Sequence, residues 1–193
     1  MTSLIESLSV LLGSFGINMI PFFSPSNLFI ASNVMLVIQS DPFSIGFLVA
    51  IGATCAKLVH YTLTFFIGKH VREEHRKRLE IAAEKMRRWA FLAIFLAALT
   101  PIPDDPVVIP LGLLKYNPVK FTLAYFTGKL SIAIIGAFLG ELSYQFLGGY
   151  LGQIVLVIIS VVLTIAITVF LLKVDLSKIE EQTLKKLGWS KDS

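Results

Sequence analysis

The sequence is poor in charged residues. Asp, Glu, Lys and Arg make up 16% of the chain, whereas they make up about a quarter of an average soluble domain. Hydrophobic residues account for 55%. Residues 151–172 form a run of 22 without any charge, and at about 1.5 Å per residue such a helix crosses a hydrocarbon core of about 30 Å. The composition therefore predicts an integral membrane protein.

Patterns typical of enzymes and secreted proteins are missing. The one cysteine, Cys55, excludes an intramolecular disulfide. The chain contains no P-loop, G-x-S-x-G or H-E-x-x-H motif and no spacing typical of metal ligands. Residues 1–19 contain no Lys or Arg, so they lack the basic start of a secretory signal and we assign them to the mature protein. We predict that the protein is not an enzyme and uses no cofactor or metal.

Apolar runs and prolines divide the chain into membrane segments. Two of these segments, 20–40 and 89–115, are broken by prolines, so each is predicted to be a re-entrant hairpin and not a straight helix. The full expected order is an interfacial or half-inserted helix at 1–19, a hairpin at 20–40, a span at 43–67, a charged cytoplasmic helix at 69–88, a hairpin at 89–115, a span at 118–142, a transmembrane helix at 150–172 and a cytoplasmic tail at 173–193.

The basic residues indicate the topology. All 17 Lys and Arg follow residue 56, and many of them fall in the 69–88 loop and the 173–193 tail, which should therefore both be cytoplasmic. If 89–115 crossed the membrane, loop and tail would lie on opposite sides. A re-entrant hairpin at 89–115 keeps them on the same side. Because topology accounts for the positive charge, we expect no nucleic-acid partner.

The two halves of the chain share a spacing. Residues 25–27 (Pro-Ser-Asn) align with residues 103–105 (Pro-Asp-Asp), each at the centre of a proline-broken segment. Gly52 and Gly128 each lie ten residues after the proline that follows that segment. Hairpin and span are thus used twice in opposite orientations, as in transporters with inverted repeats. The predicted fold class is an all-α integral membrane protein with this inverted repeat, an N-terminal interfacial helix and a C-terminal transmembrane helix.

Ionisable residues inside the apolar segments are the main candidates for function, because burying charge in a membrane is costly. Asp104 and Asp105 are expected near the midplane, as a proton or cation site or as the lining of a headgroup path, with a simple turn as the alternative. Lys57 and Lys129 lie near the middle of the two spans, where they could bind a phosphate or form ion pairs with the aspartates. His60 is expected to be a polar packing residue, although its chemistry suits proton transfer.

Other residues are expected to shape the helices. Asn27 could contact a headgroup or cap a helix, and capping is favoured. Helix breaks are predicted at Pro25, Pro103 and Pro106. Close helix packing is predicted at Gly52, Gly128, Gly136 and Gly140, of which the last two form a G-x-x-x-G pair.

Two stretches carry a resemblance to a known family. GATCAKLVHYTLTFFIGK (52–69) and TPIPDDPVVIPLGLLKYNP (100–118), within the plan of two hairpins each followed by a span, resemble the DedA/VTT-domain superfamily, also called SNARE-associated Golgi proteins. The resemblance covers about residues 20–145. It implies movement or scrambling of lipids and lipid carriers, and in bacterial members proton coupling. Bacterial members typically carry acidic residues in or near the first hairpin, whereas here the acids, Asp104 and Asp105, are in the second.

Together these features predict a multi-pass, transporter-like protein that scrambles or flips a phospholipid or a lipid-phosphate carrier. In a prokaryote it would lie in the cell membrane. The expected partners are membrane lipids, with protons and further copies of the chain as additional candidates. Two alternatives remain open. One is an exporter of small solutes or ions that uses the same aspartates, and the other is a membrane organiser that transports nothing.

Overall fold

The computed structural model describes residues 3–21, 24–67, 89–101 and 104–173, with side chains described as far as residue 170. This part of the chain folds into seven α-helices and contains no strand. Their bounds are α1 Leu4–Asn18, α2 Asn27–Ile38, α3 Pro42–Ile67, α5 Ala90–Leu99, α6 Asp105–Leu113, α7 Pro118–Leu151 and α8 Gln153–Lys173. The expected charged helix at 69–88, most of the expected tail and Pro103 lie outside the described residues.

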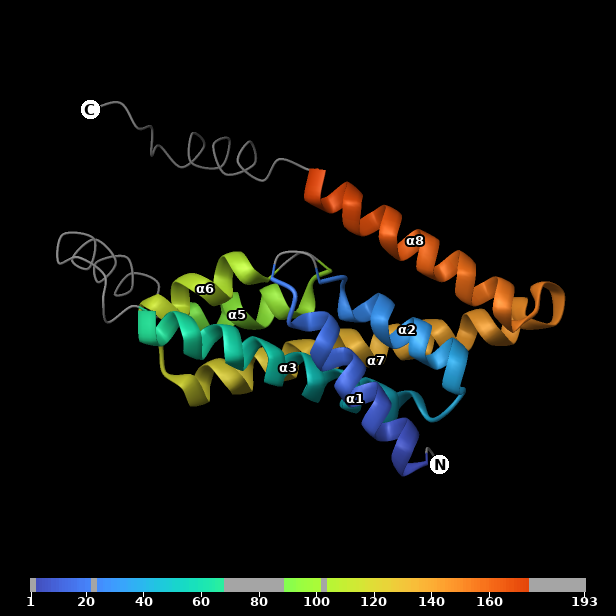
Figure 1. Ribbon diagram of the computed structural model, residues 1–193, viewed down its shortest axis with the longest axis horizontal. Helices are drawn as coiled ribbons and strands as arrows, with labels where there is room; N and C mark the ends of the chain where they lie inside the picture. The colour runs from blue at the N-terminus through green and yellow to red at the C-terminus, as the bar shows by residue number, and fades with distance from the viewer. Residues whose placement is uncertain (1–2, 22–23, 68–88, 102–103, 174–193) are drawn as a thin grey trace.

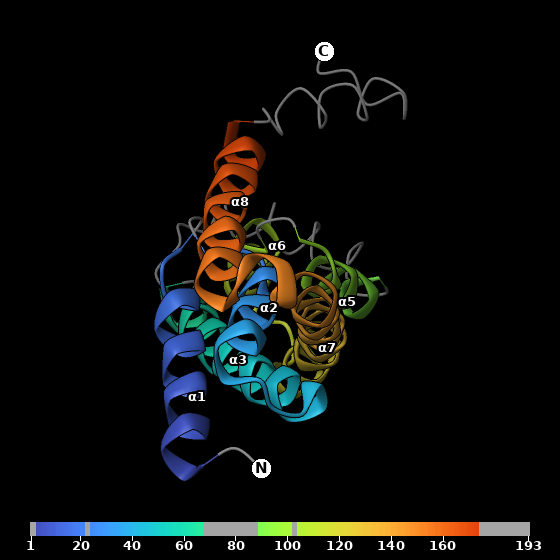
Figure 2. The same ribbon diagram turned by 90° about the vertical axis from the view of Figure 1, so that its right-hand side faces the viewer.

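The two long helices α3 and α7 pack against each other and form the centre of the molecule (Figures 1 and 2). The short helix α1 packs along α3, and α5 packs along α7. The other two short helices pack crosswise, because α2 lies mainly against α7 and α6 lies against α3. Each long helix therefore holds one short helix from its own half of the chain and one from the other half.

Glycines allow these helices to approach closely. A methyl group at Gly52 would lie 2.5 Å from the Leu11 carbonyl oxygen of α1, and one at Gly128 would lie 2.6 Å from the Phe95 carbonyl oxygen of α5. A methyl group at Gly136 would strike the Leu28 carbonyl oxygen of α2. Gly140 makes the same kind of contact one turn later, against Ser32 of α2. All four glycines thus lie where a side chain would strike the backbone of a neighbouring helix.

The connections that lead into α3 and α7 have the same local geometry. Gln39 ends α2 with a φ of 49°, and Lys115 lies just after α6 with a φ of 52°. This left-handed conformation is uncommon for residues other than glycine. Two residues further on, the Asp41 carboxylate accepts the Ser44 backbone N–H, and the Asn117 side chain accepts the N–H groups of the first turn of α7. Each long helix therefore begins after a left-handed residue and a polar cap.

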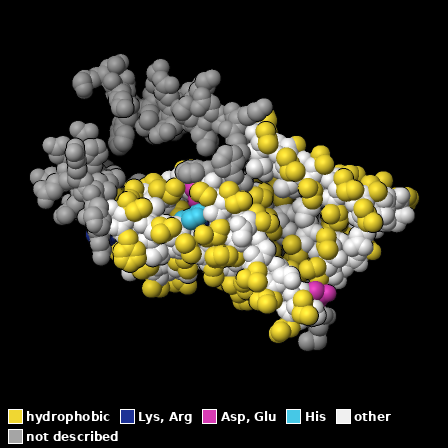
Figure 3. Space-filling model, in the orientation of Figure 1, with side chains coloured by type: hydrophobic (Ala, Val, Ile, Leu, Met, Phe, Trp, Pro, Cys, Tyr) yellow, Lys and Arg dark blue, Asp and Glu magenta, His cyan; other side chains and the backbone are white. Residues whose placement is uncertain are grey.

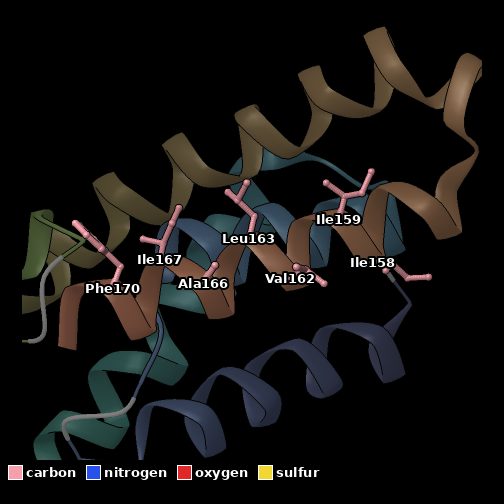
Figure 4. Close-up of a pocket in the computed structure, with 7 residues that line it drawn as sticks. All are labelled: Ile158, Ile159, Val162, Leu163, Ala166, Ile167 and Phe170. Atoms are coloured by element: carbon pink, nitrogen blue, oxygen red, sulfur yellow. The ribbon is translucent and has the colours of Figure 1, made fainter. Parts of the chain in front are cut away.

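Helix α8 contacts α2 and α7, and its end runs away from the other helices (Figures 1 and 2). The Gln153 side-chain amide donates to the Leu36 carbonyl oxygen, and Asn33 donates to the Thr164 hydroxyl. An open groove of about 570 Å³ on α8 is lined by apolar side chains between Ile158 and Phe170 (Figure 4). The groove offers hydrocarbon contacts and no charged group.

The exterior of the described helices is apolar, as Figure 3 shows for one face. Phe146 and Ile154 are 67% and 76% exposed, whereas Lys57 and Lys129 are 0% and 4% exposed. This distribution reverses that of a soluble protein. Among the described residues, three helices are long and apolar enough to cross a membrane, namely Pro42–Ile67, Pro118–Leu151 and Gln153–Phe170. The protein is a membrane protein with an all-helical fold.

The helices differ from the sequence-based expectations in three respects. The helix expected at 118–142 continues to Leu151, because no residue interrupts it before Gly152, where φ is +73°. The segment expected as a hairpin at 20–40 contains one helix, α2, preceded by a connection. The N-terminal helix expected at the interface packs along α3 and buries Ser14 and Asn18.

Candidate functional site

Asp104 and Asp105 lie at the start of α6. α5 ends at Leu99, and Thr100, the next residue, has an extended backbone. The Asp104 carbonyl accepts the first backbone N–H groups of α6, and Pro106 occupies the first turn, where a missing N–H costs nothing. Both aspartates are almost completely buried, at 3% and 1% exposure. The local sequence thus fixes two adjacent carboxylates inside the protein.

Two lysines from the long helices meet these carboxylates. The Lys57 ammonium of α3 lies 2.7 Å from Asp105 Oδ1 and 3.3 Å from Asp104 Oδ1. The Lys129 ammonium of α7 lies 2.7 Å from Asp104 Oδ2. We call these four residues the charge cluster. Its two positive and two negative side chains compensate one another, which is how buried charge is normally tolerated.

Tyr125 adds a hydroxyl donor to the charge cluster. Its phenol lies on α7 one turn before Lys129 and donates to Asp104 Oδ2 at 2.5 Å. The Lys129 ammonium lies 5.3 Å from the centre of the same ring, within the range of a cation–π contact. Tyr125 was not among the site residues predicted from the sequence. Its spacing of four residues from Lys129 is the signal that could have selected it.

His60 connects the charge cluster to the end of α1. Its Nε2 lies 3.1 Å from the Met19 carbonyl oxygen, and its Nδ1 lies 3.5 Å from Asp105 Oδ1. The side chain is 12% exposed. His60 therefore lies against the charge cluster, although it was expected to be a packing residue.

Asn27 lies in a second, uncharged polar group. The Asn18 amide donates to Asn27 Oδ1 at 3.0 Å, and the Asn27 amide donates back at 3.4 Å. Asn18 also donates to the Ser14 carbonyl oxygen, and the Ser14 hydroxyl donates to the Val49 carbonyl oxygen. The expectation that Asn27 caps a helix is wrong, because the Ser26 side chain accepts the Leu28 N–H at the start of α2. The structure does not place Asn27 among the residues that contact the aspartates.

The prolines selected from the sequence have different positions. Pro25 lies in the connection before α2, and Pro106 lies in the first turn of α6. Pro106 therefore accompanies the start of a helix, because its ring fits a first turn without breaking it. Pro110 is inside α6.

The described residues contain no group of three or more His, Cys, Asp or Glu arranged to hold a metal ion. Lysines neutralise the two aspartates instead. The chemistry that the charge cluster offers is the binding of ions and protons: two ammonium groups for an anion, and two carboxylates and an imidazole for a proton.

Comparison with known proteins gives one match. The family model described as the VTT domain matches residues 20–142, which is more than half of the chain. No curated protein and no solved structure matches the chain significantly. The matched region includes the whole charge cluster, His60 and Tyr125.

Proposed function

The chain belongs to the VTT-domain family, the DedA/SNARE-associated Golgi protein family, and from this premise we propose that it scrambles or flips a phospholipid or a lipid-phosphate carrier. The family is membrane-associated and transporter-like. The observation that carries the proposal is the buried charge cluster. Ionisable residues inside a membrane protein are costly and typically line a substrate or ion pathway.

Repeated geometry supports an inverted repeat. The left-handed residues Gln39 and Lys115 are 76 positions apart, and so are Gly52 and Gly128, which contact the first short helix of their own half. The polar caps, Asp41 and Asn117, have the same separation. In transporters built this way, the broken segments of the two repeats meet near the bilayer midplane.

In this arrangement α1 with α2, and α5 with α6, are the two re-entrant hairpins. Neither pair contains a helix longer than 15 residues, which at about 1.5 Å per residue is about 22 Å and falls short of a hydrocarbon core of about 30 Å. The short helices enter the membrane and return, and α3, α7 and α8 cross it. The basic 69–88 loop and the C-terminal tail lie on the cytoplasmic side.

A lipid phosphate would meet the charge cluster through the two lysines. An ammonium group presents three donors and a compact positive charge to phosphate oxygens. Lys57 and Lys129 are both bound to carboxylates, so the headgroup enters by displacing an aspartate from a lysine. The acyl chains stay on the apolar exterior, and only the headgroup crosses beside the start of α6. A proton that neutralises a displaced carboxylate would ease this exchange.

The test uses purified protein in proteoliposomes that contain a fluorescent phospholipid. Dithionite added outside quenches about half of the signal when lipid does not move, because only the outer leaflet is exposed. With the wild-type protein we expect quenching well beyond half. We expect Asp104→Asn/Asp105→Asn to return it to half. Glu141→Gln serves as the matched control, since it removes a carboxylate of α7 that contacts Gln145 and not the charge cluster.

A folded comparison is needed because the double variant leaves two lysines uncompensated. Lys129→Met/Asp104→Asn removes one cation and one anion together, so the remaining charges still balance. This variant should fold, and it should move lipid more slowly than the wild type. Wild-type quenching that stops at half contradicts the proposal. Solute uptake or conductance without lipid movement would instead favour an exporter.

A further inference from the structure

The two ring nitrogens of His60 have different environments. Nε2 lies 3.1 Å from a backbone carbonyl oxygen, that of Met19. A carbonyl oxygen only accepts hydrogen bonds, so this contact requires a proton on Nε2. Nδ1 is buried, has no hydrogen-bond partner in the described structure and lies 3.5 Å from Asp105 Oδ1. The Met19 contact therefore leaves Nδ1 as the nitrogen that faces the carboxylate.

This geometry favours the binding of a proton between His60 Nδ1 and Asp105. If the ring is neutral and protonated on Nε2, the Nδ1 lone pair faces a carboxylate oxygen, and two electron-rich atoms oppose each other in a buried site. A proton on Nδ1 removes the conflict, because Nδ1–H then donates to the carboxylate. Lys129 and Tyr125 both donate to the neighbouring carboxylate, Asp104.

The charged and titratable groups around His60 can be assigned helix by helix. On α6 the imidazole faces Asp105, with Asp104 beside it. On its own helix, Lys57 is three residues earlier and contacts the same Asp105 oxygen. On α7, Lys129 and Tyr125 lie behind Asp104.

The remaining helices that pack against α3 add no charge near the imidazole. Helix α2 contains no titratable residue. The one ionisable residue of α1 is Glu6, in the first turn of the helix, whereas His60 contacts Met19 at the other end. The charge state of this site is therefore set by the charge cluster and His60.

We propose that His60 Nδ1 and Asp105 Oδ1 share an exchangeable proton that switches the site from neutral to singly positive and so controls the binding of an anionic phosphate. The two lysines and two aspartates cancel, so one further proton leaves one net positive charge. An anion then gains attraction to the site before it displaces an aspartate from a lysine. This inference rests on the proposed function and names His60 as a residue that sets selectivity for charge.

The first test reads the proton directly and needs no transport. Nitrogen NMR of ¹⁵N-histidine-labelled protein in lipid nanodiscs is recorded between about pH 5 and 8, the range in which histidine changes charge. The signals absent from His60→Gln belong to His60. We expect Nε2 to stay protonated throughout and Nδ1 to gain a proton as the pH falls. A neutral ring that carries its proton on Nδ1, or a ring that does not titrate in this range, overturns the proposal.

The second test measures the rate of lipid movement over the same range of pH. For a lipid with a single phosphate charge, we expect the wild-type rate to rise by about tenfold as the pH falls from about 8 to 5, because the added positive charge attracts the phosphate. His60→Gln keeps an amide that can donate to the Met19 carbonyl oxygen but cannot titrate, so its profile should be flat. Glu141→Gln should keep the wild-type profile.

The outcomes separate the two proposals. If the wild-type protein moves no lipid but Nδ1 titrates as expected, the proposed function fails and the proton site stands. If lipid moves and His60→Gln keeps the full pH dependence, the proton site fails and the proposed function stands.

Discussion

Removing Lys57 alone should destabilise the protein more than removing Lys57 and Asp105 together. The Lys57 ammonium is 0% exposed and lies 2.7 Å from Asp105, a separation at which the attraction is about 6 kcal/mol for an effective dielectric constant of about 20. Lys57→Met leaves one lysine to compensate two buried carboxylates. The substitution also removes the cost of burying an ammonium group, so the expected loss of unfolding free energy is about 3–5 kcal/mol.

The double variant Lys57→Met/Asp105→Asn leaves Asp104 with Lys129, a compensated pair at 2.7 Å. It should recover at least about 2 kcal/mol of the loss, a coupling typical of residues in direct contact. For a chain of this length, a loss of about 3–5 kcal/mol lowers the melting temperature by roughly 6–20 °C. The assay is thermal unfolding in detergent, with the exposed Lys120→Met as the matched control. Equal melting temperatures for the single and double variants would refute the assignment of Lys57 to Asp105.

Three further changes test a helix contact, a buried amide pair and a helix cap outside the charge cluster. Gly136→Ala should cost about 1–3 kcal/mol of unfolding free energy, because its methyl group would strike the Leu28 carbonyl oxygen. Gly149→Ala meets nothing within 4 Å and should be neutral or stabilising in thermal unfolding. Asn27→Leu should cost about 1–3 kcal/mol in the same assay, because it leaves Asn18 without its partner amide. Hydrogen bonds from the backbone N–H and the hydroxyl of Ser44, three residues later in the chain, lower the pKa of Asp41 below 3.8. Asp41→Asn should therefore melt earlier than the wild type at pH 7, and this difference should shrink as the pH falls below about 4.

The pairing of lysines with aspartates could be expected in outline from the sequence. Lys57 and Lys129 interrupt apolar spans, and a buried cation needs an anion; the two adjacent aspartates are the acidic residues nearest the middle of an apolar segment. The individual partners could not be predicted. They depend on how α6 lies across α3, and that position is set by the contact of Gly112 with Thr64 and not by a pattern along one helix.

The role of α1 could not be predicted from its sequence. Its 15 residues are too few for a span, and its apolar side chains are typical of a helix at the membrane interface. The partners of its polar side chains lie on other helices. Ser14 and Asn18 become buried only because Gly52 lets α1 approach α3 and because Asn27 returns beside Asn18. Hydrogen bonds between residues 9 and 35 positions apart leave no periodic signal.

The starts of α2 and α6 carry different polar groups. Asn27 begins α2 and pairs with an amide, whereas Asp105 begins α6 and pairs with a lysine. The pair of amides, Asn18 and Asn27, has no net charge, and the two side chains donate to each other. The pair therefore has no electrostatic attraction for an anion. The charge cluster contains exchangeable partners, since one lysine contacts both aspartates. His60 contacts both regions, through Met19 next to Asn18 and through Asp105. A movement of the start of α6 therefore breaks ion pairs to α3 and α7 at once, while the opposite short helices remain held by neutral bonds.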